Sequence, residues 1–342
     1  MSSFRSFFWL HFSLDNGMTS KIKYTSDLDS LTSNEFKLLE KVCIAIKHFV
    51  SKSDKINNVS YKTRDAHVTA YSTLKGTFFA NENLEEYHIF PKQELDCLIR
   101  ISNAHMKLVS QKRTIPAYGF SVKISDEKQT IANFPLVNFP LFPINNVSHF
   151  LKIFISINRF FAGNILQKFW NLIRIMKNFL LVLPDLFHPS FLAEVLKFLR
   201  KRKHFILSFD YHSIGVYRLG NDLVKLKLVP KNTTTKIDEK RIDYSIENYL
   251  KDNNYELELM VQYCYDLEKQ PVNQLNKMWK NSDFVSIGTI KISEVIDKNN
   301  KWVEGLSFNP FESIEELQPV GRIQKLRDEA YKASFITRKN NY

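Results

Sequence analysis

A tyrosine and two arginines lie at helical spacing near the end of this 342-residue chain. In "GRIQKLRDEAYKASFITRK", Arg327 precedes Tyr331 by four residues and Arg338 follows it by seven. At 100° per residue, all three share one face of a helix with Ile323 and Ser334. An arginine beside a phenol stabilises the phenolate, and a metal ion can replace the phenol's proton. A solvated, salt-bridged terminal helix is the alternative interpretation.

A second group of candidate residues comes from two segments in the first half of the chain. In "YKTRDAHVTAYSTLKGTF", Arg64 precedes His67 by three residues at the entry to an expected strand. Residues three apart on an extended chain point to opposite faces of the strand. Arg64 can therefore bind the edge of a ligand while His67 contacts the ligand's face only if the strand begins between these two residues. In "FPLVNFPLF", Asn138 offers a neutral amide among aromatic residues. A hydrogen-bonded core histidine and a strand-end asparagine are the alternative interpretations.

The composition indicates a globular protein with a large core. Hydrophobic residues make up 44% of the chain, and its 28 Phe against 9 Gly favour an aromatic-lined pocket for a flat apolar ligand. The net charge of +12 favours anionic ligands. We expect no specific nucleic-acid partner, because the charge is spread along the chain without a helix-turn-helix, zinc-knuckle or RNA-binding signature. An anionic small-molecule cofactor needs only a few of these charges.

The cysteines and the N-terminal residues bear on location and domain limits. Cys43, Cys97 and Cys264 are widely separated and form no CxxC pair, so we expect a reducing, cytoplasmic location without disulfides or a zinc site. The N-terminal "RSFFWLHF" is too short for a secretory signal. We expect residues 1–33 to form an N-terminal arm, with Met18 as an alternative start, and residues 34–342 to form one domain.

The periodicity of the hydrophobic residues predicts an α+β fold. Residues 34–50 have apolar residues at helical spacing, and later segments alternate with a period of two between turn residues. About eight strands at irregular spacing predict an antiparallel β-barrel with surrounding helices. The segments expected to be extended are 66–80, 94–104, 117–125, 130–142, 215–230, 255–264 and 284–293.

Residues 146–204 differ from the rest, because Phe and Leu dominate there at helical spacing. Cations interrupt the stretch and leave no window of roughly 18 uncharged apolar residues, as a membrane span would need. These cations include Lys152, Arg159, Lys168, Arg174 and Lys177. We expect buried helices. Peripheral membrane contact stays open as an alternative, since basic residues interleaved with Phe and Trp are typical of an interfacial helix.

Taken in order, these segments resemble the heme catalases, specifically the shorter catalase-like proteins that have only the heme-binding core. "RDAH" matches the family's R-x-x-H, and "FNPFESIEELQPVGRIQKLRDEAY" follows its F-x-P, P-x-G and R-x-x-x-Y. "LIRISNA" and "YGFSVKI" resemble its V-R-F-S and R-G-F-A-V-K-F strands. "LVNFPLF" resembles the distal segment, with Leu-Val in place of Gly-Asn. Tyr118 stands where the family has an arginine that contacts a heme propionate.

The resemblance implies a role for each candidate residue. Tyr331 would be the proximal ligand of the heme iron and Arg327 would hydrogen-bond its phenolate. Arg64 and Arg338 would contact the propionates of heme b. On the distal side, His67 would be the acid–base catalyst and Asn138 would orient the peroxide.

The resemblance also implies a function, which is that of a heme-dependent peroxidase. Its substrate would be a small-molecule peroxide, either hydrogen peroxide or an organic hydroperoxide, and the reaction would pass through a ferryl heme. Three alternatives stay open, namely a true catalase, a lipid-hydroperoxide isomerase of the allene oxide synthase type, and a non-catalytic heme-binding or membrane-peripheral protein. Assembly into a homo-oligomer also stays open.

Overall fold

The computed structural model describes residues 20–82, 89–108, 116–234, 241–297, 301–303 and 305–339. The greater part of the predicted N-terminal arm, residues 1–19 with Met18, lies outside the described residues.

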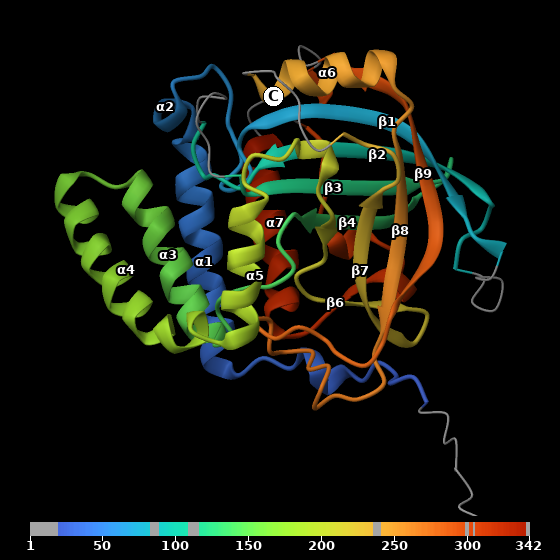
Figure 1. Cartoon of the computed structure of the whole chain (residues 1–342). Coiled ribbons are helices and arrows are strands. Elements are labelled where there is room, and N and C mark those ends of the chain that lie inside the picture. Colours follow the sequence, from blue (N-terminus) through green and yellow to red (C-terminus); the bar gives the residue numbers. More distant parts are fainter. Residues whose placement is uncertain are drawn as a thin grey trace, which may run out of the picture.

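Eight antiparallel strands close into a barrel (Figure 1). Each strand pairs with the next along the barrel wall, β9 returns to β1, and β7 pairs with β8 to complete the circle. The expected α+β fold with an antiparallel barrel of about eight strands is therefore confirmed. The barrel strands are β1 (Ala70–Ala80), β2 (Glu94–Asn103), β3 (Tyr118–Ser125), β4 (Thr130–Val137), β5 (Tyr211–His212), β7 (Asp222–Pro230), β8 (Glu256–Tyr263) and β9 (Phe284–Ile296).

Two further strands extend the sheet beside β7. The predicted extended segment 215–230 is a hairpin, because Gly220 at φ +64° turns β6 (Val216–Leu219) back into β7. The short strand β10 (Pro319–Val320) pairs with β6. Because α7 follows β10 directly, this hairpin fixes where the C-terminal helix begins.

Side chains that alternate along the strands fill the barrel interior. Along β3, for example, Phe120, Val122 and Ile124 are fully buried, and the residue that follows each of them is only partly buried. Large aromatic residues contribute much of this core, and Phe120 packs against Tyr211 with ring centroids 4.6 Å apart. The interior is thus a packed hydrophobic core.

The helices lie outside the barrel, and most of them gather on one side of it (Figure 1). α1 packs between α3 and α7, and the cluster that joins them includes Phe49, Leu151 and Leu326. The α-helices are α1 (Ser33–Ser51), α2 (Ser53–Asn57), α3 (Val147–Ala162), α4 (Ile165–Leu186), α5 (Pro189–Arg200), α6 (Ile242–Asp252) and α7 (Arg322–Lys339). Short 3-10 helices span Ser26–Asp29, Ile206–Ser208, Lys301–Val303, Pro310–Glu312 and Glu315–Leu317.

The stretch 146–204 contains α3, α4 and α5, but the expectation that its helices are buried is wrong for two of them. Only Asn171 and Val182 of α4 are buried, and α5 has no buried residue. The reason is position, because α4 packs mainly against α3 on the side away from the barrel (Figure 1). Among the described helices, none is by itself long and apolar enough to cross a membrane; α4 and α5 meet that criterion only together, as a pair bent by 95°.

Candidate functional site

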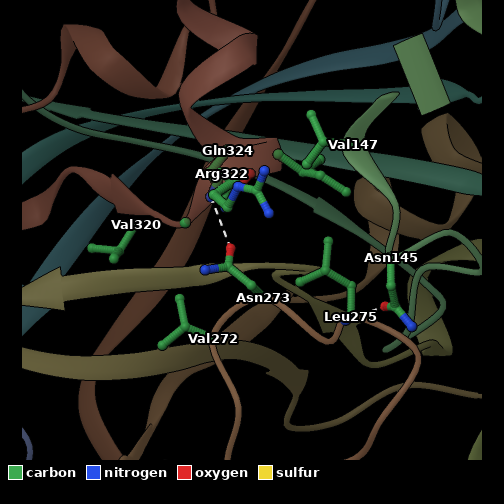
Figure 2. Close-up of a pocket in the computed structure, with 10 residues that line it drawn as sticks. Asn145, Val147, Val272, Asn273, Leu275, Val320, Arg322 and Gln324 are labelled. Carbon is green, nitrogen blue, oxygen red and sulfur yellow. Dashed lines mark hydrogen bonds between the residues drawn. The ribbon is translucent and has the colours of Figure 1, made fainter. Parts of the chain in front are cut away.

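The first turn of α7 is held in place by three contacts. Gly321 has φ +113°, a backbone conformation that glycine adopts readily and other residues rarely adopt. Its N–H donates to Asp29 Oδ1 at 2.6 Å. The N–H of Arg322 donates to Asn273 Oδ1 at 2.8 Å, as Figure 2 shows. The guanidinium of Arg322 binds both carboxylate oxygens of Glu35, on α1, at 2.6 and 2.7 Å. These contacts fix the rotation of α7 and hence the direction of the face that carries Arg327 and Tyr331.

On that face, Arg327 lies against Tyr331 as the helical spacing predicted. The guanidinium donates to the phenol oxygen at 3.0 Å and to Gln324 Oε1 at 2.8 Å. Burial alone would lower the pKa of Arg327, but Tyr331 and Tyr217 beside it raise the pKa above its usual value. Burial raises the pKa of the Tyr217 phenol to about 12. Arg327 is therefore a permanent positive charge between two phenols, and α7 is packed rather than solvated all round.

His67 lies three residues before β1 in a left-handed backbone conformation, with φ +53°. The condition that a strand begins between Arg64 and His67 is not met, because β1 begins at Ala70, after both residues. A bend, and not strand alternation, directs the imidazole. Non-glycine residues with positive φ are uncommon and are concentrated at functional sites.

The imidazole of His67 is positioned by two neighbours. Its Nδ1 lies 3.1 Å from Ser102 Oγ, and its ring lies so close to Gly119 that a Cβ there would come within 2.6 Å. Ser102 Oγ also donates its proton to the carbonyl of Gly119 at 3.5 Å. The lone pairs of Ser102 Oγ are therefore left to accept a hydrogen bond from the Nδ1–H of His67. This arrangement favours the neutral tautomer whose lone pair is at Nε2.

The pKa of His67 is lowered to about 3, mainly by burial and further by the positive charges of Arg100, Arg327 and Arg64. Arg100 belongs to β2, Arg327 to α7 and Arg64 to the segment before β1. The fold therefore brings the pair Arg64 and His67 close to the candidate face of α7. Arg100 is a site residue that the sequence reasoning missed. It is buried, and it donates to the carbonyl oxygen of His67 at 2.9 Å. Its place in "LIRISNA" was the available signal.

Asp65 is a second residue that the sequence reasoning missed. Burial raises the pKa of its carboxyl group, while a hydrogen bond from Ser334 and the charges of Arg338 and Arg64 act in the opposite direction. Arg64 also donates to the carbonyl oxygen of Leu306 at 2.8 Å. Arg64 and Arg338, the two arginines predicted to bind propionates, therefore both lie near Asp65, whose negative charge partly offsets their positive charge.

Asn138 and Tyr118 are joined by hydrogen bonds at the ends of β3 and β4. The Asn138 side chain accepts from the N–H of Tyr118 and donates to the carbonyl of Pro116, both at 2.8 Å. This is the strand-end role that was its alternative interpretation, and a catalytic role for Asn138 stays a prediction. The Tyr118 ring packs against Tyr71 and Phe209 in the core, so it does not replace the cation that the family has there.

A small pocket at the start of α7 is separate from these residues (Figure 2). Its volume of about 10 Å³ is enough for one water molecule. Asn145, which lines it, accepts from the N–H of Leu275 at 2.7 Å. We assign this pocket a structural role. Elsewhere, no cluster of three or more His, Cys, Asp or Glu in the described part of the chain could hold a metal ion.

Comparison with known proteins places the fold. No protein-family model and no curated protein matches the chain. The crystal structure of a fungal catalase matches with a TM-score of 0.60 and 16% sequence identity, over 83% of this chain and 60% of that chain. Catalase A from Saccharomyces cerevisiae matches with a TM-score of 0.60 and 18% identity, over 83% and 62%. The chain has a catalase-like fold. It spans about three fifths of the length of these two catalases.

The side chains around His67 and α7 fit an anionic heme in their chemistry. Tyr331 offers an oxygen ligand next to a fixed positive charge, and Arg64, Arg100 and Arg338 provide guanidinium groups of the kind that bind carboxylates. Because residue 119 is a glycine, there is room for the imidazole of His67, whereas any larger side chain at position 119 would fill that space. Asp65 is the one charge in this set that opposes an anionic ligand.

Proposed function

We propose that this chain is a heme-dependent peroxidase that reduces hydrogen peroxide or organic hydroperoxides with electrons from an organic donor. The observation that supports this most strongly is the hydrogen bond from Arg327 to Tyr331, on a helix face whose charge acts on His67. The catalase-like fold agrees with peroxide as the substrate class, because both matched structures are named catalases. When bound, ferric heme b would supply the redox chemistry that cleaves the peroxide O–O bond.

On the proximal side, we propose that Tyr331 binds the iron as a phenolate. Arg327, 3.0 Å from the phenol oxygen, offsets the negative charge of that ligand. Gln324 holds the guanidinium from the other side, at 2.8 Å, so that the charge stays directed at the phenol. An anionic oxygen ligand donates electron density and favours the ferric state.

On the distal side, we propose that His67 moves the proton. Its imidazole is neutral above about pH 3, so it is ready to accept the proton of a peroxide at Nε2. It would then return that proton to the leaving oxygen, which departs as water or alcohol. Ser102 keeps Nδ1 protonated and fixes the ring during both transfers.

Arg64 and Arg338 would bind the heme propionates through charge-assisted hydrogen bonds. Asp65 shares their neighbourhood, so its charge would weaken that binding unless it takes up a proton. Its raised pKa makes protonation easier than for an ordinary aspartate.

Catalase activity is the second candidate, and the two similar structures favour it by name. The full chain, loaded with heme, separates the candidates when oxygen release and dye oxidation are measured in the same reaction with hydrogen peroxide. Dye oxidation in excess of oxygen release supports the peroxidase, and oxygen release alone supports the catalase. Turnover of a lipid hydroperoxide with neither signal indicates an isomerase, and a bound heme with no turnover of either peroxide contradicts an enzymatic function.

A further inference from the structure

The outward face of α4 is apolar and uncovered. Ile165, Phe169, Ile173, Met176 and Leu180 are each between 41% and 88% exposed. At 100° per residue these five side chains lie within an arc of about 80°. The buried residues of α4, Asn171 and Val182, project from the opposite side toward α3. Figure 1 shows α4 as the outermost helix, with its far side away from the barrel. A face of this size is unusual on a protein that meets only water.

Cations border this apolar face along both edges. On one side Lys177 and the half-exposed Trp170 lie about 40° and 60° beyond the edge, and on the other side Lys168 lies about 60° beyond it. Long basic side chains and tryptophan at the boundary of an apolar face are typical of a helix that lies in the plane of a lipid surface.

The neighbourhood of α4 has almost no negative charge to complement these cations. Residues 147–204 contain ten Lys or Arg and two acids, a net of +8 of the chain's +12. Both acids are engaged within the protein. Asp185 accepts from the N–H of Asn145 at 3.0 Å, and Glu194 pairs with Lys197 at 2.6 Å.

The charge decides between the occupants that could cover the face. A second copy of the chain, related by a two-fold axis, would bring together two helical stretches that each carry a net charge of +8, which electrostatic repulsion opposes. An anionic bilayer offers hydrocarbon to the apolar side chains and negative headgroups to the cations on both edges.

We propose that α4 docks the protein onto the surface of anionic lipid bilayers. The helix would lie parallel to the surface, with Phe169, Met176 and Leu180 inserted to the level of the upper acyl chains. Lys168 and Lys177 would reach the headgroups. This proposal is independent of the bound heme and of the peroxide chemistry.

The test is co-sedimentation of the full chain with vesicles of phosphatidylserine and phosphatidylcholine, compared with vesicles of phosphatidylcholine alone. We expect binding to the anionic vesicles that weakens as salt is raised, and much weaker binding to the neutral ones. In a Trp9→Phe, Trp302→Phe background, Trp170 emission should shift to shorter wavelength on binding, because the remaining Trp279 is already buried. Absence of binding to the anionic vesicles would overturn the proposal.

Substitutions on α4 locate the contact. Phe169→Glu should weaken vesicle binding more than tenfold, because it removes apolar surface and places a charge in the inserted face. Lys177→Gln should weaken it about fivefold. Leu267→Glu, the same type of change at an exposed leucine outside the helices, is the matched control and should bind as the unaltered chain does.

The rival occupant gives different results. If light scattering finds a stable dimer that Phe169→Glu dissociates, and vesicle binding is absent, a second copy covers the face and the proposal is wrong. Vesicle binding that Phe169→Glu and Lys177→Gln leave unchanged would also contradict it. Circular dichroism and thermal unfolding of each variant separate these outcomes from a failure to fold.

Discussion

His67 is the residue on which the proposed chemistry depends most. Replacing it with alanine removes the group that we propose to accept and return the proton, while the arginines and Tyr331 remain. We expect His67→Ala to retain bound heme and to slow the reaction with hydrogen peroxide by about a hundredfold or more. Stopped-flow absorbance of the heme-loaded protein measures this rate. An unchanged rate would mean that the imidazole has only a structural role.

The depressed pKa of His67 also predicts how stability depends on pH. An unfolded histidine takes up a proton near pH 6.5, whereas the pKa of folded His67 is about 3. Its contribution to the free energy of unfolding is therefore fully present above pH 6.5 and is lost as the pH falls toward 3. As the pH falls from 6.5 toward 3, we expect the free energy of unfolding to decrease less for His67→Gln than for the unaltered chain. Urea unfolding of the heme-free protein at each pH measures this decrease.

A control for this comparison comes from a second buried histidine. The pKa of His212 is lowered to about 4, chiefly by burial, although Asp210 raises it. His212→Gln should therefore flatten the same pH profile independently, and the two substitutions should add. A profile that His67→Gln leaves unaltered would contradict the low pKa of this residue.

Asp65 predicts a gain of affinity on substitution. Its carboxylate lies among Arg64, Arg338 and Ser334, where it competes with an anionic ligand for the arginines. We expect Asp65→Asn to tighten heme binding about tenfold at neutral pH, because one short-range negative charge is removed. Heme titration followed at the Soret band gives the Kd. The exposed Asp96 provides a control, since Asp96→Asn should leave the Kd unchanged, and weaker binding to Asp65→Asn would mean that Asp65 supports the site.

At the scale of elements, α7 brings the proposed proximal group Tyr331, with Arg327, into the neighbourhood of His67. Gly321 allows β10 to turn into α7 at φ +113°, and a Cβ at this position would also approach Asn273 Oδ1 to 3.1 Å. We expect Gly321→Ala to lower the free energy of unfolding by about 1–3 kcal/mol. Heme affinity should fall as well, because the start of the helix would shift. Urea unfolding and heme titration measure both effects, and an unaltered Kd would mean that the helix position does not depend on this turn.

The sequence predicted α7 and the barrel strands because their periodicity is local. Arg327 and Tyr331 interact at the spacing of one helical turn, and β1, β2 and β3 begin close to the predicted residues. The bend at His67 was not predictable in this way, since φ +53° depends on its contacts with Ser102 and Gly119 from other strands. The two-residue strand β5 has too few residues to show a period.

At the scale of the whole molecule, the sequence did not predict which faces are covered. The same apolar spacing that buries α1 between α3 and α7 occurs in α4, where only one side has a neighbour. Periodicity reports that a face is apolar and does not report what covers it. Likewise, Asp65 became visible as a site residue only when the fold brought α7, with Ser334 and Arg338, to the segment that precedes β1.

The central claim, that Tyr331 is the ligand of a heme iron, is tested most directly by resonance Raman spectroscopy of the heme-loaded chain and its Tyr331→Phe variant. We expect the unaltered chain to show tyrosinate-to-iron bands. The variant should lose these bands and most of its heme affinity, because it keeps the ring and removes only the oxygen. Arg327→Ala, the matched control, should keep the bands and release heme more readily as the pH falls. A Tyr331→Phe protein that binds heme with an unaltered spectrum would contradict the account.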